Sequence, residues 1–260
     1  LNNLDENKNN AIQYACQQIL NNQYHDQFPI DMIQGGAGTS TNMNINEVLA
    51  NIGLEYLEHL KGEYQYLHPN NDVNMSQSTN DVYPTAIKVG LISAIDQLNT
   101  PFKNLIQSFK NKLDEFAHIL KMGRTQLQDA VPMTLGQEFG AFATTLQNDL
   151  NKLNQIMPDA LSVVNLGGTA IGTGINTEVQ YREYAIASLS EMTQRNMSSA
   201  PDLIEATSDM GDFVLLSSLL KRTAIKLSKI SNDLRLLSSG PRAGLNEIHL
   251  EPRQPGSSIM

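Results

Sequence analysis

The sequence has little of what several common kinds of site require, and each absence narrows the possible functions. Its 260 residues include a single cysteine, Cys16, which excludes an intrachain disulfide and a cysteine-based zinc site. No run approaches the roughly 18 consecutive apolar residues that a membrane-spanning helix requires. Lys and Arg total 18 against 27 Asp and Glu, and the resulting net charge of −9 argues against nucleic acid as the main partner.

Nucleotide-binding and metal-binding motifs are also missing. The glycine-rich stretch at 35–38 lacks the Gly-x-x-x-x-Gly-Lys-Ser/Thr pattern of a phosphate loop, and the glycines at 167–172 do not follow a predicted strand. The five histidines have no metal-ligand spacing. No Ser-His-Asp set and no paired carboxylates are evident, because Asp81 and Asp129 each sit among helix-start residues, where capping explains them. We therefore expect neither a cofactor nor a metal.

What the sequence does contain is helical periodicity, with apolar residues at steps of three and four. One long helix is predicted over 82–120, and Pro101 within it should kink it or split it in two. A second is predicted over 202–237, opened by a Pro-Asp pair and closed by a Ser-Ser-Gly-Pro turn. Seams of this length favour a mainly α, long-helix bundle, often shared between subunits. A weak strand signal covers 122–127. Shorter helices are expected at 6–21, 44–60, 134–157 and 178–193.

Chemistry must be sought in the connections, four of which are rich in Gly, Ser, Thr and Asn. They span residues 34–44, 76–81, 123–132 and 166–174. Hydroxyls and amides at helix N-termini cap the helix, and together with backbone N–H groups and the helix dipole they bind anions. For any one loop, capping alone is the simpler interpretation. Four such loops and the Gly-Ser-Ser stretch at 256–258 together favour a carboxylate-binding site suited to carbanion chemistry rather than hydrolysis.

The amino-acid sequences of these loops form motifs that are specific enough to indicate a family. They include Gly-Thr-Ser-Thr-Asn-Met-Asn at 38–44, Ser-Thr-Asn-Asp at 78–81, Gly-Arg-Thr at 123–125, Gly-Thr-Ala-Ile-Gly-Thr-Gly at 168–174 and Gly-Ser-Ser-Ile-Met at 256–260. With these motifs the chain resembles the aspartase/fumarase superfamily of homotetrameric lyases over essentially its whole length. Two features make the chain more similar to the aspartate ammonia-lyases of that superfamily than to its fumarases. The chain has Gln-Gly-Gly-Ala-Gly-Thr at 34–39, and it has Gln126 where fumarases usually carry His.

The resemblance implies a fold and an activity. Residues 1–77 would be the remainder of an N-terminal helical domain, and residues 78–260 an incomplete central long-helix bundle that ends in the Gly-Ser-Ser loop. The implied reaction is the reversible elimination of ammonia from L-aspartate to give fumarate through an aci-carboxylate, without a cofactor. The implied assembly is a cytoplasmic homotetramer with active sites shared between subunits. Family members extend past both ends of this chain, so we expect it to be truncated at both.

Site residues carry over from the resemblance by position. Ser257 would be the general base, in a loop that closes over the substrate. The substrate-binding residues would be Thr39, Ser78, Thr79, Thr125 and Ser258 at the carboxylates, Asn80 near the amino group, and Gln126 in place of the commoner His.

Two alternatives stay open. One is a fumarase that interconverts malate and fumarate. The other is a non-catalytic helical fragment that only assembles with itself or a longer homologue, which we expect if the reading frame stops at Met260 rather than continuing with Pro-x-Lys-x-Asn-Pro.

Overall fold

The computed structural model describes residues 3–33 and 35–256 and is mainly α-helical, as predicted. The strands form two small sheets, β1 (Leu120–Thr125) with β2 (Gln128–Thr134), and β3 (Val163–Val164) with β4 (Ser198–Ser199). The longer helices are α1 (Glu6–Leu20), α2 (Thr39–Tyr56), α3 (Thr79–Glu115), α4 (Leu135–Ser162), α5 (Tyr181–Thr193), α6 (Leu203–Ser208) and α7 (Gly211–Leu237). Short helical turns lie at His25–Gln27 and Pro69–Val73.

The chain divides into two compact units. Unit 1 comprises Leu1–Ile92 and Asp159–Met210, and unit 2 comprises Ser93–Pro158 and Gly211–Met260. The domain division at residues 77 and 78, which follows from the family resemblance, stays a prediction.

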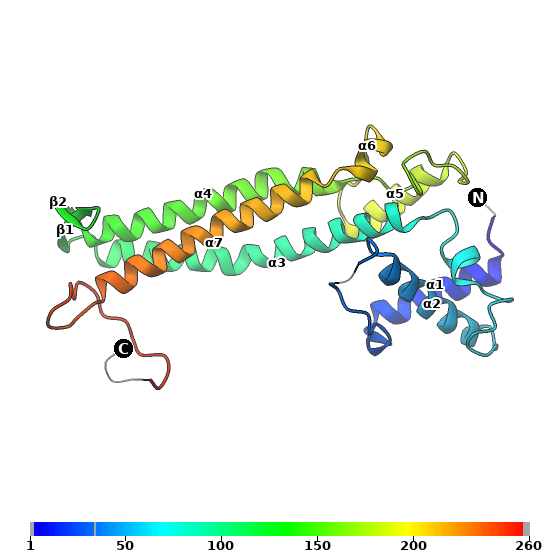
Figure 1. Cartoon of the computed structure of the whole chain (residues 1–260), viewed down its shortest axis with the longest axis horizontal. Coiled ribbons are helices and arrows are strands. Elements are labelled where there is room, and N and C mark those ends of the chain that lie inside the picture. The colour runs from blue at the N-terminus through cyan, green and yellow to red at the C-terminus, as the bar shows by residue number, and fades with distance from the viewer. Residues whose placement is uncertain (1–2, 34, 257–260) are drawn as a thin grey trace. The chain divides into compact units, whose positions relative to one another are not determined.

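In unit 1, α1 and α2 pack side by side (Figure 1). Ala15 of α1 and Ala50 of α2 are both fully buried in their shared core, and their small side chains let the two helices approach closely. The side chain of Asp5 accepts hydrogen bonds from the N–H groups of Asn7 and Lys8, which satisfies donors that the first turn of α1 would otherwise leave unpaired.

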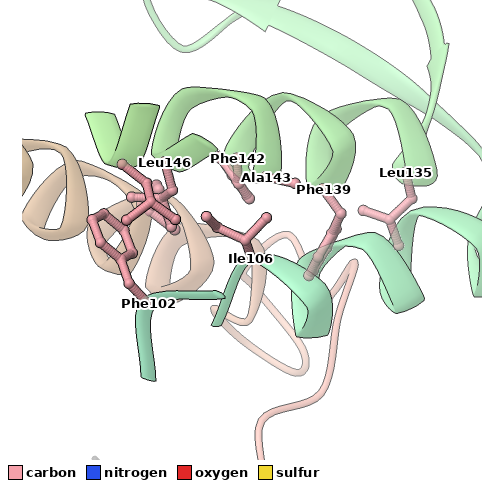
Figure 2. Packing of buried hydrophobic residues seen from close by; sticks show 9 residues of the cluster. Phe102, Ile106, Leu135, Phe139, Phe142, Ala143 and Leu146 are labelled. Carbon is pink, nitrogen blue, oxygen red and sulfur yellow. The ribbon is translucent and has the colours of Figure 1, made fainter. Parts of the chain in front are cut away.

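In unit 2, parts of α3 and α4 run alongside α7, and the β1–β2 hairpin connects α3 to α4 (Figure 1). Side chains of α3 and α4 point toward one another in the core (Figure 2). Phe139 and Phe142 pack edge-to-face with ring centroids 5.8 Å apart, a favoured aromatic geometry. Ile230 of α7 is buried in the same cluster, so the apolar seams predicted on both long helices do meet in one core.

Of the two outcomes predicted for Pro101, a kink or a split of the first long helix, the split does not occur. α3 continues through the proline for 37 residues and ends at Glu115, five residues short of the predicted end. Phe102 and Ile106, directly after the proline, are buried in the unit 2 core, and their packing holds the backbone in helical conformation. Gln97, whose carbonyl loses its partner at the proline, is exposed, so water can replace the missing hydrogen bond.

The second predicted long helix, by contrast, is not continuous. Asp209 adopts an extended conformation (φ −80°, ψ 133°) that ends α6, and α7 begins at Gly211. The predicted start signal at Asp202 is confirmed, because its side chain caps α6. Two smaller predictions are also corrected: α2 begins five residues earlier than expected, at Thr39, and Asp129 lies in strand β2 rather than at a helix start.

Candidate active site

The N-terminal end of α3 carries the Ser-Thr-Asn-Asp motif. Oγ of Ser78 accepts a hydrogen bond from the backbone N–H of Asn80 at 3.2 Å, and Oδ1 of Asp81 accepts one from the N–H of Ser78 at 2.9 Å. These reciprocal bonds form a capping box that fixes the chain's entry into the helix. Ser78, Thr79 and Asn80 therefore offer hydroxyl and amide groups at the positive end of the α3 dipole, where anions are stabilised.

Asp81 also joins this helix end to the glycine-rich loop at 166–174. The residue is fully buried, and its Oδ2 accepts hydrogen bonds from the backbone N–H groups of Gly167 at 3.1 Å and Thr169 at 2.8 Å. Asn80 donates from Nδ2 to the carbonyl oxygen of Ala170 at 2.6 Å. Two of the four loops singled out in the sequence are thus held together within unit 1.

The conformation of that loop explains its glycines. Gly167 and Gly172 have φ angles of +87° and +90°, in the left-handed region that glycine enters without strain. A Cβ on Gly172 would lie 2.3 Å from the carbonyl oxygen of Leu203, which forbids any side chain. The glycine spacing therefore serves a tight turn packed against α6, and the same turn presents the N–H groups that Asp81 binds.

Two titratable groups near this junction have perturbed pKa values. Burial raises the pKa of Asp81, although hydrogen bonds from backbone N–H groups, those of Ser78, Thr169 and Gly167 among them, oppose the shift. Burial, and then the charge of Asp81, raise the pKa of Tyr181 to about 12 despite its hydrogen bond with Gln77. Tyr181 is therefore protonated at neutral pH, and both oxygens of Asp81 are engaged by backbone donors. Neither residue is suited to remove a proton from a substrate.

The N-terminal end of α2 borders the same region of unit 1. Asn42 donates from Nδ2 to Oγ1 of Thr79 at 2.9 Å, which ties the first turns of α2 to the start of α3. Gly38, in the left-handed conformation at the helix N-cap, sits so close to Tyr83 that an added Cβ would lie 2.3 Å from the ring. Thr39, the first residue of α2, is exposed. Unit 1 thus gathers four of the predicted substrate-binding residues on neighbouring helix ends, namely Thr39, Ser78, Thr79 and Asn80.

Two more predicted residues, Thr125 and Gln126, lie in unit 2 at the tip of the β1–β2 hairpin. Thr125 pairs with Gln128 as the last rung of the ladder, and both side chains at the tip are exposed. Gln126 and Leu127 have φ angles of +49° and +68°, which is the two-residue turn with both central residues left-handed that suits the twist of a hairpin. The weak strand signal at 122–127 is therefore confirmed for residues 122–125, which belong to a hairpin, whereas Gln126 and Leu127 form its turn.

Ser257 and Ser258, the predicted base and its neighbour, lie outside the described residues. Some neighbours of the predicted residues were not singled out from the sequence: Asn165 and Tyr181 in unit 1 and, separately, a group of charged residues beside the hairpin in unit 2. Asn165 is buried and donates from Nδ2 to the carbonyl oxygen of Asn80 at 3.0 Å. Only its position directly before the glycine-rich loop could have pointed to it.

Within residues 3–33 and 35–256, no cluster of three or more His, Cys, Asp or Glu side chains has a metal-binding arrangement. None of the helices in that part of the chain is long and apolar enough to cross a membrane.

Comparisons with known proteins define the class of protein. A family model described as "Lyase" matches residues 1–260, so the chain belongs to this lyase family. Over 260 residues it is 64% identical to an aspartate ammonia-lyase of Pseudomonas aeruginosa, covering 100% of this chain and 55% of that protein. It is 58% identical over 252 residues to an aspartate ammonia-lyase of Escherichia coli K12, covering 96% of this chain and 52% of that protein. The family resemblance seen in the loop motifs is confirmed.

Solved structures support the same conclusion about the fold. The structure of a fumarate lyase:delta crystallin from Brucella melitensis bound to cobalt matches with a TM-score of 0.95 at 55% identity, covering 99% of this chain and 56% of that one. A class II fumarase from Schistosoma mansoni matches with a TM-score of 0.87 at 34% identity, covering 99% and 57%. The predicted long-helix fold of this superfamily is therefore confirmed. The chain spans about half the length of the curated relatives it matches.

Proposed function

We propose that the protein to which this chain belongs is an aspartate ammonia-lyase, which reversibly eliminates ammonia from L-aspartate to give fumarate. The observation that carries the proposal is the group of donors at the start of α3, fixed by buried Asp81 onto the loop at 166–174. The identity of 64% to an aspartate ammonia-lyase along the whole chain supports the choice of substrate.

The reaction requires stabilisation of negative charge. Removal of a proton from C3 leaves an electron pair that is delocalised into the adjacent carboxylate, and the resulting aci-carboxylate carries a double negative charge. Preorganised donors stabilise such a charge effectively, because they need not reorient as it develops. The hydroxyls of Thr39, Ser78 and Thr79 and the positive end of α3 have this character. Thr125 and Ser258 would also bind carboxylate oxygens of the substrate.

The substrate amino group needs an acceptor instead. Nδ2 of Asn80 already donates to the carbonyl oxygen of Ala170, which leaves Oδ1 as the atom suited to accept from an ammonium N–H. As the C2–N bond breaks, its electron pair goes to nitrogen and the double bond of fumarate forms between C2 and C3. Gln126 stands where many relatives carry His, so an amide would contact the substrate there and could not take up a proton.

Ser257 would take the C3 proton. A serine hydroxyl requires a strongly lowered pKa for this role, which a closed pocket rich in hydrogen-bond donors can provide. The buried carboxylate near the donors, Asp81, points its oxygens at backbone N–H groups, so its geometry leaves the role of base to another residue.

Fumarase is the second candidate, because a class II fumarase shares the fold with a TM-score of 0.87. The full-length protein, assayed by fumarate absorbance, should convert aspartate and leave malate unchanged. Thr79→Ala should lower kcat/KM by about 10²–10³. Ser108→Ala, which removes an exposed α3 hydroxyl bonded only to the carbonyl of Asn104, is the matched control and should leave turnover unaltered. Turnover of malate without turnover of aspartate would contradict the proposal.

We also propose a homotetramer with active sites shared between subunits, located in the cytoplasm. Large apolar side chains are exposed along α7, including Val214 (63% exposed) and Ile225 (60%). An apolar cavity of about 200 Å³, lined by residues such as Phe102 and Leu220, opens on the same unit. Surfaces of this kind usually bind another protein surface. Light scattering of the full-length protein should give four chains, and a stable monomer would contradict this.

A further inference from the structure

Four charged side chains lie together beside the β1–β2 hairpin, and they are called the charged cluster below. Lys121 on β1 forms an ion pair with Glu138 in the first turn of α4, and its Nζ lies 2.9 Å from Oε2 of Glu247. Arg124, further along β1, forms a second ion pair with Glu247. The charged cluster balances two positive against two negative charges, and the Lys121 and Glu247 side chains are only 6% and 17% exposed. Ion pairs shielded to this degree hold their geometry better than surface pairs do.

The spacing of the two cations on β1 is unusual. Side chains three residues apart on a regular strand point to opposite faces. The β1–β2 register shifts between Met122 and Arg124, where two residues of β2, Ala130 and Val131, stand opposite Gly123 of β1. A Cβ on Gly123 would lie 2.8 Å from the carbonyl oxygen of Val131, which explains why glycine occupies the position. Lys121 and Arg124 nevertheless both reach Glu247, beside this irregular part of the ladder.

Glu247 is itself held in place by the backbone. After α7 ends at Leu237 the chain folds back, and the N–H groups of Glu247 and Ile248 both donate to the carbonyl oxygen of Leu237, at 2.9 and 3.3 Å. The N–H of Asn246 donates to the carbonyl oxygen of Ser239 at 2.8 Å. The carboxylate therefore extends from a fixed point at the end of α7 to the hairpin.

Thr125 directly follows Arg124 on β1. Because successive side chains of a strand alternate between its faces, an Arg124 side chain drawn to Glu247 turns the Thr125 side chain to the opposite face. We propose that Glu247 is a positioning residue for Thr125: by holding Arg124 and Lys121 it fixes the orientation in which the hairpin tip presents the Thr125 hydroxyl to a substrate carboxylate. This inference rests on the proposed function, which places Thr125 at the substrate.

The ionisation of Glu247 agrees with this role. Burial alone would raise its pKa, but hydrogen bonds from Arg124 and Lys121, together with their charges, outweigh burial, and the pKa is lowered. Glu247 is thus a carboxylate at any pH at which the enzyme would act.

The test is a double-mutant cycle of Glu247→Gln and Thr125→Ala in the full-length protein, with kcat and KM for aspartate measured separately. Glu247→Gln keeps the shape of the side chain and removes its charge. Misplacement of a binding group by about 1 Å can reduce rates by about 10²-fold, so E247Q should lower kcat/KM by about 10- to 100-fold. In the T125A background, E247Q should change kcat/KM by less than about twofold, because the group it positions is already gone.

Two further variants complete the design. Glu247→Asp keeps the charge and should recover much of the lost kcat/KM. Glu115→Gln, which breaks an exposed ion pair with Lys112, is the matched control and should leave kcat/KM unchanged. If E247Q does not fold, the same cycle is run with Arg124→Lys, which keeps the charge but removes the planar guanidinium fork.

The outcomes separate the inference from the proposed function. If E247Q and T125A each lower kcat/KM and their effects simply add, Glu247 has only a structural role and the inference is overturned while the proposed function stands. If T125A leaves kcat/KM unchanged, or the unsubstituted protein does not turn over aspartate, the placement of Thr125 at the substrate is wrong and the inference falls with it.

Discussion

Each unit holds a hydroxyl-bearing segment with a carboxylate, but the partners of the two carboxylates differ, and so does the direction of their pKa shifts. In unit 1, fully buried Asp81 accepts hydrogen bonds from three backbone N–H groups, of Ser78, Gly167 and Thr169, and burial raises its pKa. In unit 2, Glu247 is held by the cations of Lys121 and Arg124, and its pKa is lowered. Backbone N–H groups hold the Asp81 carboxylate by hydrogen bonds but carry no net charge to balance it. The Lys121 and Arg124 side chains hold Glu247 and also balance its charge. The first arrangement should therefore be the more rigid, and the second the more sensitive to charge.

The largest expected effect is on Asp81→Ala. It would leave three backbone donors without an acceptor, and since each buried unsatisfied donor costs about 1–3 kcal/mol, we expect a loss of about 3–5 kcal/mol in the free energy of unfolding. Urea unfolding followed by circular dichroism measures it. Asp81→Asn keeps one acceptor oxygen and should lose less.

Asp202→Ala is the matched control for that measurement. Asp202 also accepts from backbone N–H groups, those of Ile204 and Glu205, but it only caps an exposed helix end. Its loss should be about 0.5–2 kcal/mol. If D81A destabilised the protein no more than D202A does, Asp81 would be merely a helix cap, and the contrast between the two units would disappear.

The two carboxylates should also respond to pH in opposite directions. Glu247, with a lowered folded pKa, contributes stability that is present above its unfolded pKa of roughly 4.3 and is lost as pH falls through the folded value. Asp81, with a raised folded pKa, opposes folding when ionised, so its contribution becomes more favourable as pH falls through that raised value. Acidification should therefore shrink the stability deficit of E247Q and enlarge that of D81N.

Urea unfolding of both variants and of the unsubstituted protein, repeated from pH 7 to about pH 3, checks this difference in sign. Deficits that change in the same direction with pH would show that one of the two carboxylates is held differently from the description above.

The smallest effect is expected at the tip of the hairpin, whose orientation we infer is fixed by the ion pairs of Glu247 with Arg124 and Lys121. Leu127 is exposed and has a φ of +68°, a conformation that strains a leucine but not a glycine. Leu127→Gly should stabilise the protein by about 0.5 kcal/mol, since the relieved strain slightly exceeds the added entropy of the unfolded chain. Thermal unfolding provides the measurement.

Leu20→Gly is the matched control, because Leu20 is equally exposed but lies in helical conformation at the end of α1, and glycine there should cost about 1 kcal/mol. A large loss of kcat/KM in L127G would mean that the turn at the hairpin tip sets the orientation of Thr125, and that the ion pairs of Lys121 and Arg124 with Glu247 do not.

Local patterns predicted most of the elements, and they failed where tertiary contacts override propensity. Pro101 reads as a helix breaker, yet buried Phe102 and Ile106 keep α3 continuous. Thr39 to Asn44 read as loop, yet Asn42 finds an acceptor in Thr79, and the helix starts early. The site followed the same rule. Ser78, Thr79 and Asn80 were predicted as site residues from their motif, whereas Asn165 and Glu247 were not predicted, because their partners lie 85 and 123 residues away along the chain.

The sequence by itself determined the helical class, the places of the hydroxyl-rich loops and the family, since periodicity, turn residues and motif wording are local properties. Only the tertiary structure decided what holds those loops in place. From the sequence alone, Asp81 is predicted only to cap a helix. In the structure its second carboxylate oxygen also accepts hydrogen bonds from a loop 86 and 88 residues away. This long-range contact links two segments of the candidate site. Contacts of this kind depend on how helices pack, which no short stretch of sequence encodes.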